Sequence, residues 1–527
     1  MGDVRLRSIE ISGIKNVLNG KIEFPLAKKN ETGYVDVKSE IVGIYGQNGS
    51  GKTAVITALW FLKLLMSGDP LPDDTCDYIN NDCNSATIKA SFFLSWGEFA
   101  WYEAVIKKTV DASPENDDGG FIISAEKVSY SEIKNGKPGR KTTLIEYDEN
   151  TPSSQEFMPN KMWEIYINRD SIHPGADRET AKKENKSFVF YNEDSSDEYG
   201  LSDNWGMERL WAETNYRDLP LEFDTKEDYE EWLYWKDILE DKEYEESVDK
   251  MWLLRYLIWF ANNDFFVVGV TGSDRSDFSI IFRSNNRPSY KKSSGTEEYT
   301  VNIAKPKEHK REKISYKQGT DEWTYEHITK PIGIPSKDRS TVESIIKHNN
   351  EVINAIVPGL SLELRSIGVL EGDKEESFEI ISLRDGKAIP LRQESEGIRK
   401  IISMLYALIL AYNDPFTIVA IDELDAGVYE YLLGEILQVF DETGKGQLIF
   451  TSHNLRALEV LDKTSIVFTT TNPENKFISP KYIKANNNLR DVYLRSIRLG
   501  GQDEELYSET KMHAIRRAMR KAGEAAE

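Results

Sequence analysis

The sequence is poor in cysteine and has no apolar run long enough to cross a bilayer. Its two cysteines, Cys76 and Cys83, lie close together with no nearby histidine, so neither a disulfide framework nor a zinc site can be argued. The longest apolar stretches, such as Ile401–Tyr412, are much shorter than a membrane span, and the first residues lack the apolar segment of a signal peptide. We therefore expect a cytoplasmic protein with reduced thiols and no membrane partner.

Positive charge is also scarce, because the net charge of the chain is -23. Such a charge repels nucleic acid on average, so any DNA contact requires a local basic surface. The charge is segregated along the chain. Residues Glu222–Lys250 hold 13 acidic and 4 basic side chains, whereas Arg283–Lys317 hold 10 basic and 4 acidic ones.

The chain is rich in apolar strands that alternate with helices, a pattern that is typical of a mainly parallel sheet. The strand Glu40–Tyr45 runs into a glycine-rich turn, and a helix is predicted to begin at Gly51 or Lys52. Residues Ala86–Tyr147 alternate β-rich runs with turn signals, which predicts an antiparallel meander. After Ser340 the α/β pattern returns, with apolar strands at Phe416–Ile421 and Gln447–Thr451.

The composition changes between these two α/β parts. An acidic, aromatic and helical stretch, Trp205–Asn263, precedes a basic, β-prone one, and we interpret both as an insertion of mixed α and β structure. The expected division is an N-terminal lobe over 1–183, the insertion over 184–330, a C-terminal lobe over 331–499 and a C-terminal helix over 500–527.

The glycine-rich turn carries the pattern G-x-x-x-x-G-K-T, whose glycines let backbone N–H groups close around phosphate oxygens at a helix N-terminus. An ordinary glycine-rich turn is the alternative, and the strand before it and the helix after it argue against that. In this pattern Lys52 reaches the β- and γ-phosphates of ATP, and Thr53 binds Mg²⁺. The predicted ATP-binding residues are Gly46, Gln47, Asn48, Gly49, Ser50, Gly51, Lys52 and Thr53.

Two further elements end at the same predicted sheet edge. The strand Phe416–Ile421 delivers Asp422 and Glu423 to its C-terminal end, where ligands of parallel sheets bind. Asp422 suits the magnesium shell, and Glu423 suits a general base that polarises water. Ser452-His453-Asn454 directly follow the strand Gln447–Thr451, and there the His453 imidazole can hydrogen-bond the γ-phosphate. Lys52, Glu423 and His453 are the predicted catalytic residues.

The loop, the Asp-Glu strand and the histidine strand, in this order, resemble the ABC-type ATPase heads of the SMC and RecF group. In those heads a serine-x-glycine signature contacts the ATP of a second head, which implies that role for Ser395 and Gly397; a helix cap is the alternative. The resemblance also implies a D-loop role for Asp425. The segment Ile9–Val17 resembles the opening strand and turn of these heads, which implies that Lys15 lies near the nucleotide.

Lys52 and Asp422 are 370 residues apart in the sequence. In transporter ABC domains the corresponding lysine and aspartate are separated by far fewer residues. SMC proteins place a long coiled coil between these two positions, but residues 184–330 show no sustained heptads. The compact OLD-like AAA ATPases of anti-phage systems, of the PARIS, Septu and abortive-infection groups, are the most similar overall. Only 74 residues follow His453, too few for the Toprim nuclease of OLD proteins, so we expect any nuclease to be a separate chain.

The resemblance implies an oligomeric ATPase, a pair of heads or a larger ring, that senses a phage component and controls a separate effector such as a nuclease. The alternative is a RecF-like repair protein that binds duplex DNA across its heads. The basic stretch Arg283–Lys317 and the C-terminal Arg516, Arg517, Arg520 and Lys521 keep this alternative open, although solvated surfaces explain them too. A transporter subunit is disfavoured by the split head.

Overall fold

The computed structural model describes most of the two α/β parts and little of the segment between them. The described residues are 4–28, 38–95, 97–109, 120–134, 137–150, 157–158, 178–190, 253–254, 256–269, 280–283, 315–316, 322–325, 332–333, 339–369, 376–481, 488–508 and 511–524. The acidic stretch up to residue 252 and most of the basic stretch Arg283–Lys317 lie outside them.

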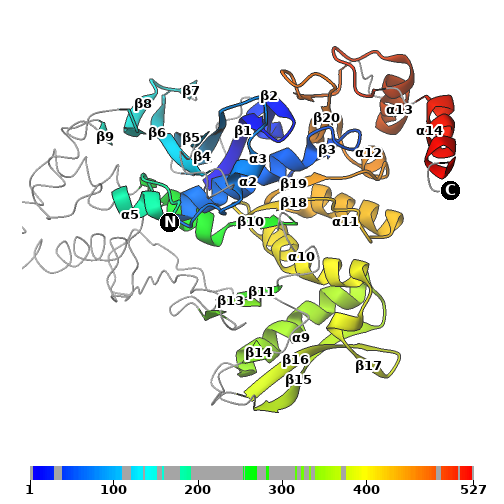
Figure 1. Cartoon of the computed structure of the whole chain (residues 1–527). Coiled ribbons are helices and arrows are strands. Elements are labelled where there is room, and N and C mark those ends of the chain that lie inside the picture. Colours follow the sequence, from blue (N-terminus) through cyan, green and yellow to red (C-terminus); the bar gives the residue numbers. More distant parts are fainter. Residues whose placement is uncertain are drawn as a thin grey trace, which may run out of the picture.

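A six-stranded, mainly parallel sheet forms the centre of the molecule (Figure 1). Its strands lie in the order β10-β18-β19-β3-β20-β21, and only the last pair is antiparallel. The strands are β3 (Glu40–Tyr45), β10 (Phe265–Val268), β18 (Ile418–Ile421), β19 (Gln447–Thr451), β20 (Ile466–Thr469) and β21 (Phe477–Ile478). The predicted parallel pairing of β3, β18 and β19 is confirmed.

One strand of this sheet corrects the predicted insertion. β10 lies inside the expected segment 184–330, yet it pairs in parallel with β18 from Phe265 to Val268. The helical residues 256–263 lead into it, and Phe260 and Phe265 are buried in the main core. This part of the segment therefore belongs to the central sheet.

A second, antiparallel sheet covers the first. Its order is β2-β1-β4-β5-β6-β8-β9, with β7 paired to β6, which confirms the predicted meander. The strands are β1 (Val4–Ile14), β2 (Val17–Glu23), β4 (Ser85–Leu94), β5 (Glu98–Lys108), β6 (Phe121–Lys134), β7 (Lys137–Pro138), β8 (Thr142–Asp148) and β9 (Phe157–Met158). The short helices α1 (Pro25–Lys28), α3 (Thr75–Tyr78) and α5 (Arg178–Lys183) accompany it.

The helix α2 (Lys52–Ser67) is buried between the two sheets, because it is apolar on nearly every side. Val42 and Ile44 of β3 face this helix, whereas Ile41 and Tyr45 face a second core on the other side of the sheet. The helices α10 (Glu396–Asn413), α11 (Glu430–Thr443), α12 (Ala457–Val460) and α13 (Leu489–Leu499) contribute to the second core. The layers confirm the predicted fold class, an α/β P-loop NTPase head of the ABC type with an antiparallel β subdomain.

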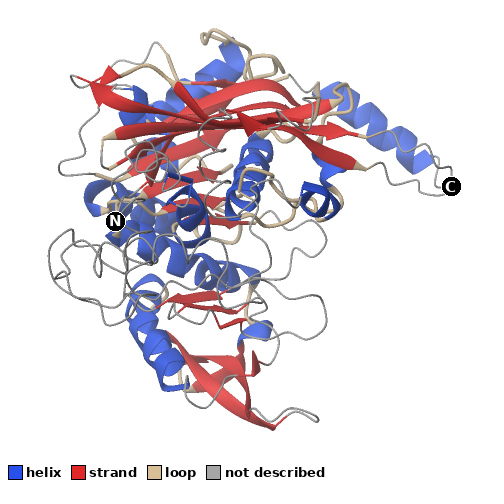
Figure 2. Ribbon diagram, turned by 90° about the vertical axis from the view of Figure 1, so that its left-hand side faces the viewer, coloured by secondary structure: helices blue, strands red, loops and turns tan. Residues whose placement is uncertain are grey.

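A smaller unit projects from α10, in the lower part of Figures 1 and 2. It consists of α9 (Arg339–Ile356), β14 (Ile332–Gly333), β15 (Leu360–Val369), β16 (Glu376–Arg384) and β17 (Lys387–Pro390), packed around a third core. A further three-stranded sheet comprises β11 (Ile280–Arg283), β12 (Ser315–Tyr316) and β13 (Glu322–Tyr325).

The C-terminal end differs from the single helix predicted over 500–527. The helix α14 is shorter, Met512–Glu524, and residues 500–508 run without regular helix or strand structure. Leu506 in this segment is buried in the second core. Packing against that core therefore fixes the segment, although it does not form a helix. None of the described helices is both long and apolar enough to cross a membrane.

Candidate functional site

The glycine-rich loop joins β3 to α2, as the sequence predicts. All six residues of β3 are buried, and the backbone of Gly49 and Gly51 takes the left-handed conformation with φ of 73° and 98°. A side chain is excluded at Gly46 as well, since a Cβ there would lie 1.6 Å from Oγ1 of Thr469. This tight path places the N-terminus of α2 at the mouth of the loop, where backbone N–H groups and the helix dipole favour an anion.

Lys52 lies at the first residue of α2 and is buried at 6% exposure. Its Nζ donates to the carbonyl oxygens of Gly46 (3.0 Å) and Gln47 (3.1 Å). Burial lowers the pKa of this ammonium group, while Asp422 and Glu423 act in the opposite direction. The lysine thus lies between the loop and two carboxylates.

Asp422 follows β18 and faces Thr53 of α2. The Thr53 hydroxyl lies 3.4 Å from Oδ1 of Asp422, and the Thr451 hydroxyl at the end of β19 donates to the same oxygen at 2.5 Å. A hydroxyl and a carboxylate facing one another are the oxygen ligands that Mg²⁺ uses beside phosphate, so these residues fit the predicted ion. In the described part of the chain no group of three or more His, Cys, Asp and Glu residues is arranged to hold a metal ion.

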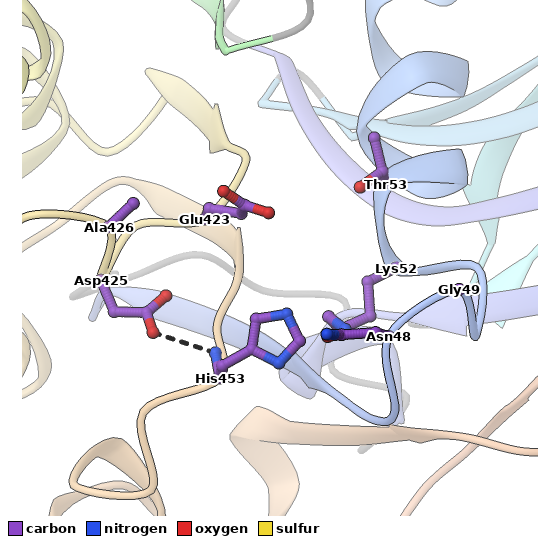
Figure 3. A pocket seen from close by; sticks show the side chains of 8 residues that line it. All are labelled: Asn48, Gly49, Lys52, Thr53, Glu423, Asp425, Ala426 and His453. Atoms are coloured by element: carbon purple, nitrogen blue, oxygen red, sulfur yellow. Dashed lines mark hydrogen bonds between the residues drawn. The ribbon is translucent and has the colours of Figure 1, made fainter. Parts of the chain in front are cut away.

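Glu423 has an unusual backbone, with a φ of 49°. Its N–H donates to the Thr451 hydroxyl at 2.7 Å, and Nζ of Lys400 on α10 donates to the carbonyl oxygens of Asp422 (3.3 Å) and Glu423. Left-handed backbone at a residue that is not glycine is strained and is retained where surrounding contacts hold it. The turn directs the Glu423 carboxylate toward the space between β18 and the loop (Figure 3).

His453 follows β19 and completes the wall of this space. Its backbone N–H donates to Oδ2 of Asp425 at 3.1 Å, and the N–H of Asn454 donates to the same oxygen at 2.9 Å. The imidazole points across toward Asn48 and Lys52 (Figure 3). The pocket has a volume of about 660 Å³ and is lined by Asn48, Gly49, Lys52, Thr53, Glu423, Asp425, Ala426 and His453. This size is suitable for a nucleotide.

The structure does not bring the predicted signature residues into this pocket. Ser395 is exposed and caps α10, and its Oγ accepts from the N–H of Ile398 at 3.4 Å. Gly397 packs on the backbone of Gly427, because a Cβ at Gly397 would lie 2.1 Å from the Gly427 carbonyl oxygen. Ser395 therefore caps α10, and Gly397 permits the close approach of α10 to the turn at Gly427. Because Ser395 is exposed, it remains accessible to a second molecule.

Lys15 also lies outside the residues that line the pocket. It takes a φ of 51° in the turn between β1 and β2, and its Nζ lies 5.2 Å from the centre of the Tyr78 ring. Burial lowers the pKa of its ammonium group, and Asp422 acts against this effect. The neighbouring Asn16 donates from Nδ2 to the carbonyl oxygen of Gly49, so this turn is fastened to the loop.

Two features of the site are not indicated by any sequence motif. Lys400 has no motif of its own, although it lies five residues after Ser395 on the predicted helix. The C-terminal segment is the other, because the N–H of Ser508 donates to Oε1 of Gln47 at 3.1 Å. No sequence signal connects residues 461 positions apart, and only the three-dimensional structure reveals this contact.

Residues 41–459 match the protein family described as "AAA domain, putative AbiEii toxin, Type IV TA system". The match covers well over half of the 527-residue chain and extends from β3 to α12, including the loop, Asp422, Glu423 and His453. A search of the curated proteins finds no match.

Solved structures of SMC head domains are similar to the chain at low identity. A Smc head with an extended coiled coil, bound to the C-terminal domain of ScpA from Pyrococcus furiosus, is 14% identical over 90% of this chain and 96% of that chain, with a TM-score of 0.33. A Smc head bound to the C-winged helix domain of ScpA is 12% identical over 91% and 99%, with a TM-score of 0.33. The SMC head from Thermotoga maritima is 12% identical over 90% and 99%, with a TM-score of 0.29. At such TM-scores nothing follows for the ligands or partners of this chain.

Proposed function

This chain belongs to the family described as AAA domain, putative AbiEii toxin, Type IV TA system, and from that premise we propose that it binds and hydrolyses ATP. The observation that carries the proposal is a single pocket in which the P-loop Lys52 faces Glu423 and His453. Lys52 comes from the start of α2, and Glu423 and His453 follow β18 and β19. Their convergence supplies a cation, a base and a hydrogen-bond donor around one phosphate chain.

The roles of the residues follow from their positions. The loop Gly46–Thr53 binds the phosphates, and Lys52 balances their charge. Thr53 and Asp422 would hold Mg²⁺, which when bound neutralises phosphate charge. Glu423 accepts a proton from the attacking water, and His453 donates a hydrogen bond to the terminal phosphate. Lys15, fastened beside the loop, contributes a further positive charge.

We propose that a second copy completes each site through Ser395 and the N-terminus of α10. Ser395 is exposed and lies outside the pocket of its own chain, which supports contact in trans. Asp425 connects the two sites, because its carboxylate holds the backbone of His453 while the following turn packs on Gly397. Closure of two heads on ATP and reopening after hydrolysis is then the switch.

The role of this switch is the finer part of the proposal. The first candidate is a sensor that controls a separate effector, such as a nuclease, in an anti-phage system; the family's description, which names a putative toxin of a toxin–antitoxin system, supports only a role in a system with a second component. The second candidate, binding of duplex DNA, is favoured by α14, where Arg516, Arg517, Arg520 and Lys521 are all exposed. DNA binding that weakens steeply with salt would support this second candidate, and copurification of an effector would support the first.

Mixing two inactive variants tests both the ATPase and its composite site. Lys52→Ala and Ser395→Arg chains should each be inactive, while a 1:1 mixture should recover about a quarter of wild-type turnover, because half of the random pairs keep one intact site. Ser344→Arg, at another exposed serine, is the control and should stay active. A mixture as inactive as its parts rules out a shared site. Separately, Glu423→Gln should abolish turnover and retain ATP binding; wild-type turnover in this variant would refute the assigned base.

A further inference from the structure

Lys476 lies beside the phosphate-binding loop, in the connection between β20 and β21. Its side chain crosses β2, where a Cβ on Gly20 would lie 3.3 Å from the Lys476 Cβ, and its Cε would lie 3.2 Å from a Cβ on Gly51. Gly51 is the N-cap of α2. The head of this lysine is therefore placed at the N-terminal end of the 16-residue helix that forms the predicted phosphate site.

This lysine is buried at 5% exposure, and its ammonium group has no acceptor or carboxylate partner among the described residues. Burial lowers its pKa, and no acidic group opposes that effect. Lys52 differs, since Asp422 and Glu423 balance its charge. The side chain is thus largely buried without a charge partner among the described residues, and it lies beside the positive end of a helix dipole. Two positive charges placed together indicate an anion as their ligand.

The position of Lys476 is fixed on both sides of its backbone. Its N–H donates to the carbonyl oxygen of Asn19 at 3.1 Å, and its own carbonyl oxygen accepts from the N–H of Thr470 at 2.9 Å. The preceding Asn475 donates from Nδ2 to Glu504 at 2.9 Å, in the same C-terminal segment whose Ser508 contacts the loop. These contacts hold the charge in place before any ligand binds, so little ordering is required on binding.

We propose that Lys476 is a nucleotide-binding residue that contacts the α-phosphate. The inference rests on the proposed ATP-binding function and extends it to a residue outside every motif of the sequence. Lys476 does not line the pocket that contains Glu423 and His453, which holds the terminal phosphate in the proposed mechanism. The remaining anionic part of the nucleotide at the Gly51 end of the loop is its α-phosphate. Lys476 thus supplies binding that ATP and ADP share.

Lys476→Met tests this inference, because methionine keeps an apolar stem over Gly20 and Gly51 and removes the charge. We expect the Kd values of fluorescent ATP and ADP analogues to rise about tenfold, as for the loss of one charge-assisted contact. The melting temperature without nucleotide should stay unchanged or rise, because the lost charge has no acidic partner among the described residues. Lys481→Met, at an exposed lysine paired with Asp503, is the control and should bind nucleotide like wild type.

Two outcomes overturn the inference. Wild-type affinity in Lys476→Met shows that the ammonium does not contact the nucleotide, and a lowered melting temperature without nucleotide shows that it stabilises the fold instead. The proposed ATPase is tested apart from this. If wild type itself fails to bind ATP, the proposed function is wrong, whereas binding that is lost only in Lys52→Ala leaves the proposed function intact and rejects the role of Lys476.

Discussion

Replacing Gly397 by alanine tests how close the start of α10 must lie to the turn after β18. A Cβ at this position would lie 2.1 Å from the carbonyl oxygen and 3.3 Å from Cα of Gly427, whereas ordinary contact begins at 3.4 Å. Backbone forms both sides of this contact, so no side-chain rotation relieves the clash. Either α10 or the turn must move by about 1 Å, as in other overpacked sites.

This displacement should lower both the free energy of unfolding and the rate of ATP turnover. Overpacking of this kind costs about 1–3 kcal/mol of unfolding free energy. The turn also contains Asp425, whose carboxylate accepts from the backbone N–H of His453, so its movement reaches the candidate pocket. Misplacement of a catalytic group by about 1 Å lowers rates by about 100-fold. ATP affinity should change by less than about threefold, because Lys52 and Thr53 lie on another element.

Urea unfolding, ATP turnover and nucleotide binding measured together separate these effects. Gly434→Ala is the matched control, since its added Cβ would meet only the flexible side chain of Arg456 on a neighbouring element, and it should keep wild-type turnover. A Gly397→Ala protein with wild-type stability and turnover would refute the reasoning. Loss of ATP binding to the same degree as turnover would also refute it, because the effect would then not be confined to catalysis.

Three further predictions concern the fold. Arg5→Met should lower the free energy of unfolding by about 3–5 kcal/mol in urea titrations, because the buried Glu40 carboxylate loses its partner at 2.6 Å. Glu126→Ala should cost more than about 2 kcal/mol in the same assay by leaving Tyr102 and Ser187 hydroxyls unpaired, while Glu126→Gln should cost less. Hydrogen bonds from Arg490 and Arg456 lower the pKa of Glu459, so its stabilisation is present above its unfolded pKa of about 4.3 and is lost as pH falls through the folded pKa. Glu459→Gln should therefore be less stable than wild type at pH 7, by under about 1 kcal/mol at this partly exposed site, and equally stable in acid; an equal deficit at both pH values would contradict the assignment.

The half of the site that is local in sequence could be predicted from the chain alone. The loop lies between an apolar strand and an apolar helix, so its spacing, its left-handed Gly49 and Gly51 and its helix start follow from local rules. Asp422 and His453 were placed at one sheet edge because each directly follows a strand of parallel type. In the structure Asp422 faces Thr53, and His453 lines the same pocket as Lys52.

The half that depends on distant contacts could not be predicted. β10 is a four-residue strand surrounded by polar sequence, and its partner β18 follows about 150 residues later. The approach of Gly397 to Gly427 likewise depends on where α10 meets the sheet. Taken alone, each glycine would predict only a turn or a contact with phosphate. Lys400 and Lys476 lack a motif, because only the fold brings Lys400 to the turn after β18 and Lys476 beside Gly51.

The separation of 370 residues between Lys52 and Asp422 is compatible with one site because the sheet, and not the chain between them, sets their distance. β3 pairs with β19, and β19 pairs with β18, in continuous parallel register. Thr451 at the end of β19 then fixes both carboxylate residues, since its hydroxyl donates to Asp422 and accepts from the N–H of Glu423. Among the described residues between α2 and β18, β10 is the one strand that joins this sheet, at the outer side of β18. The distance between Lys52 and Asp422 therefore does not depend on the number of residues that connect α2 to β18.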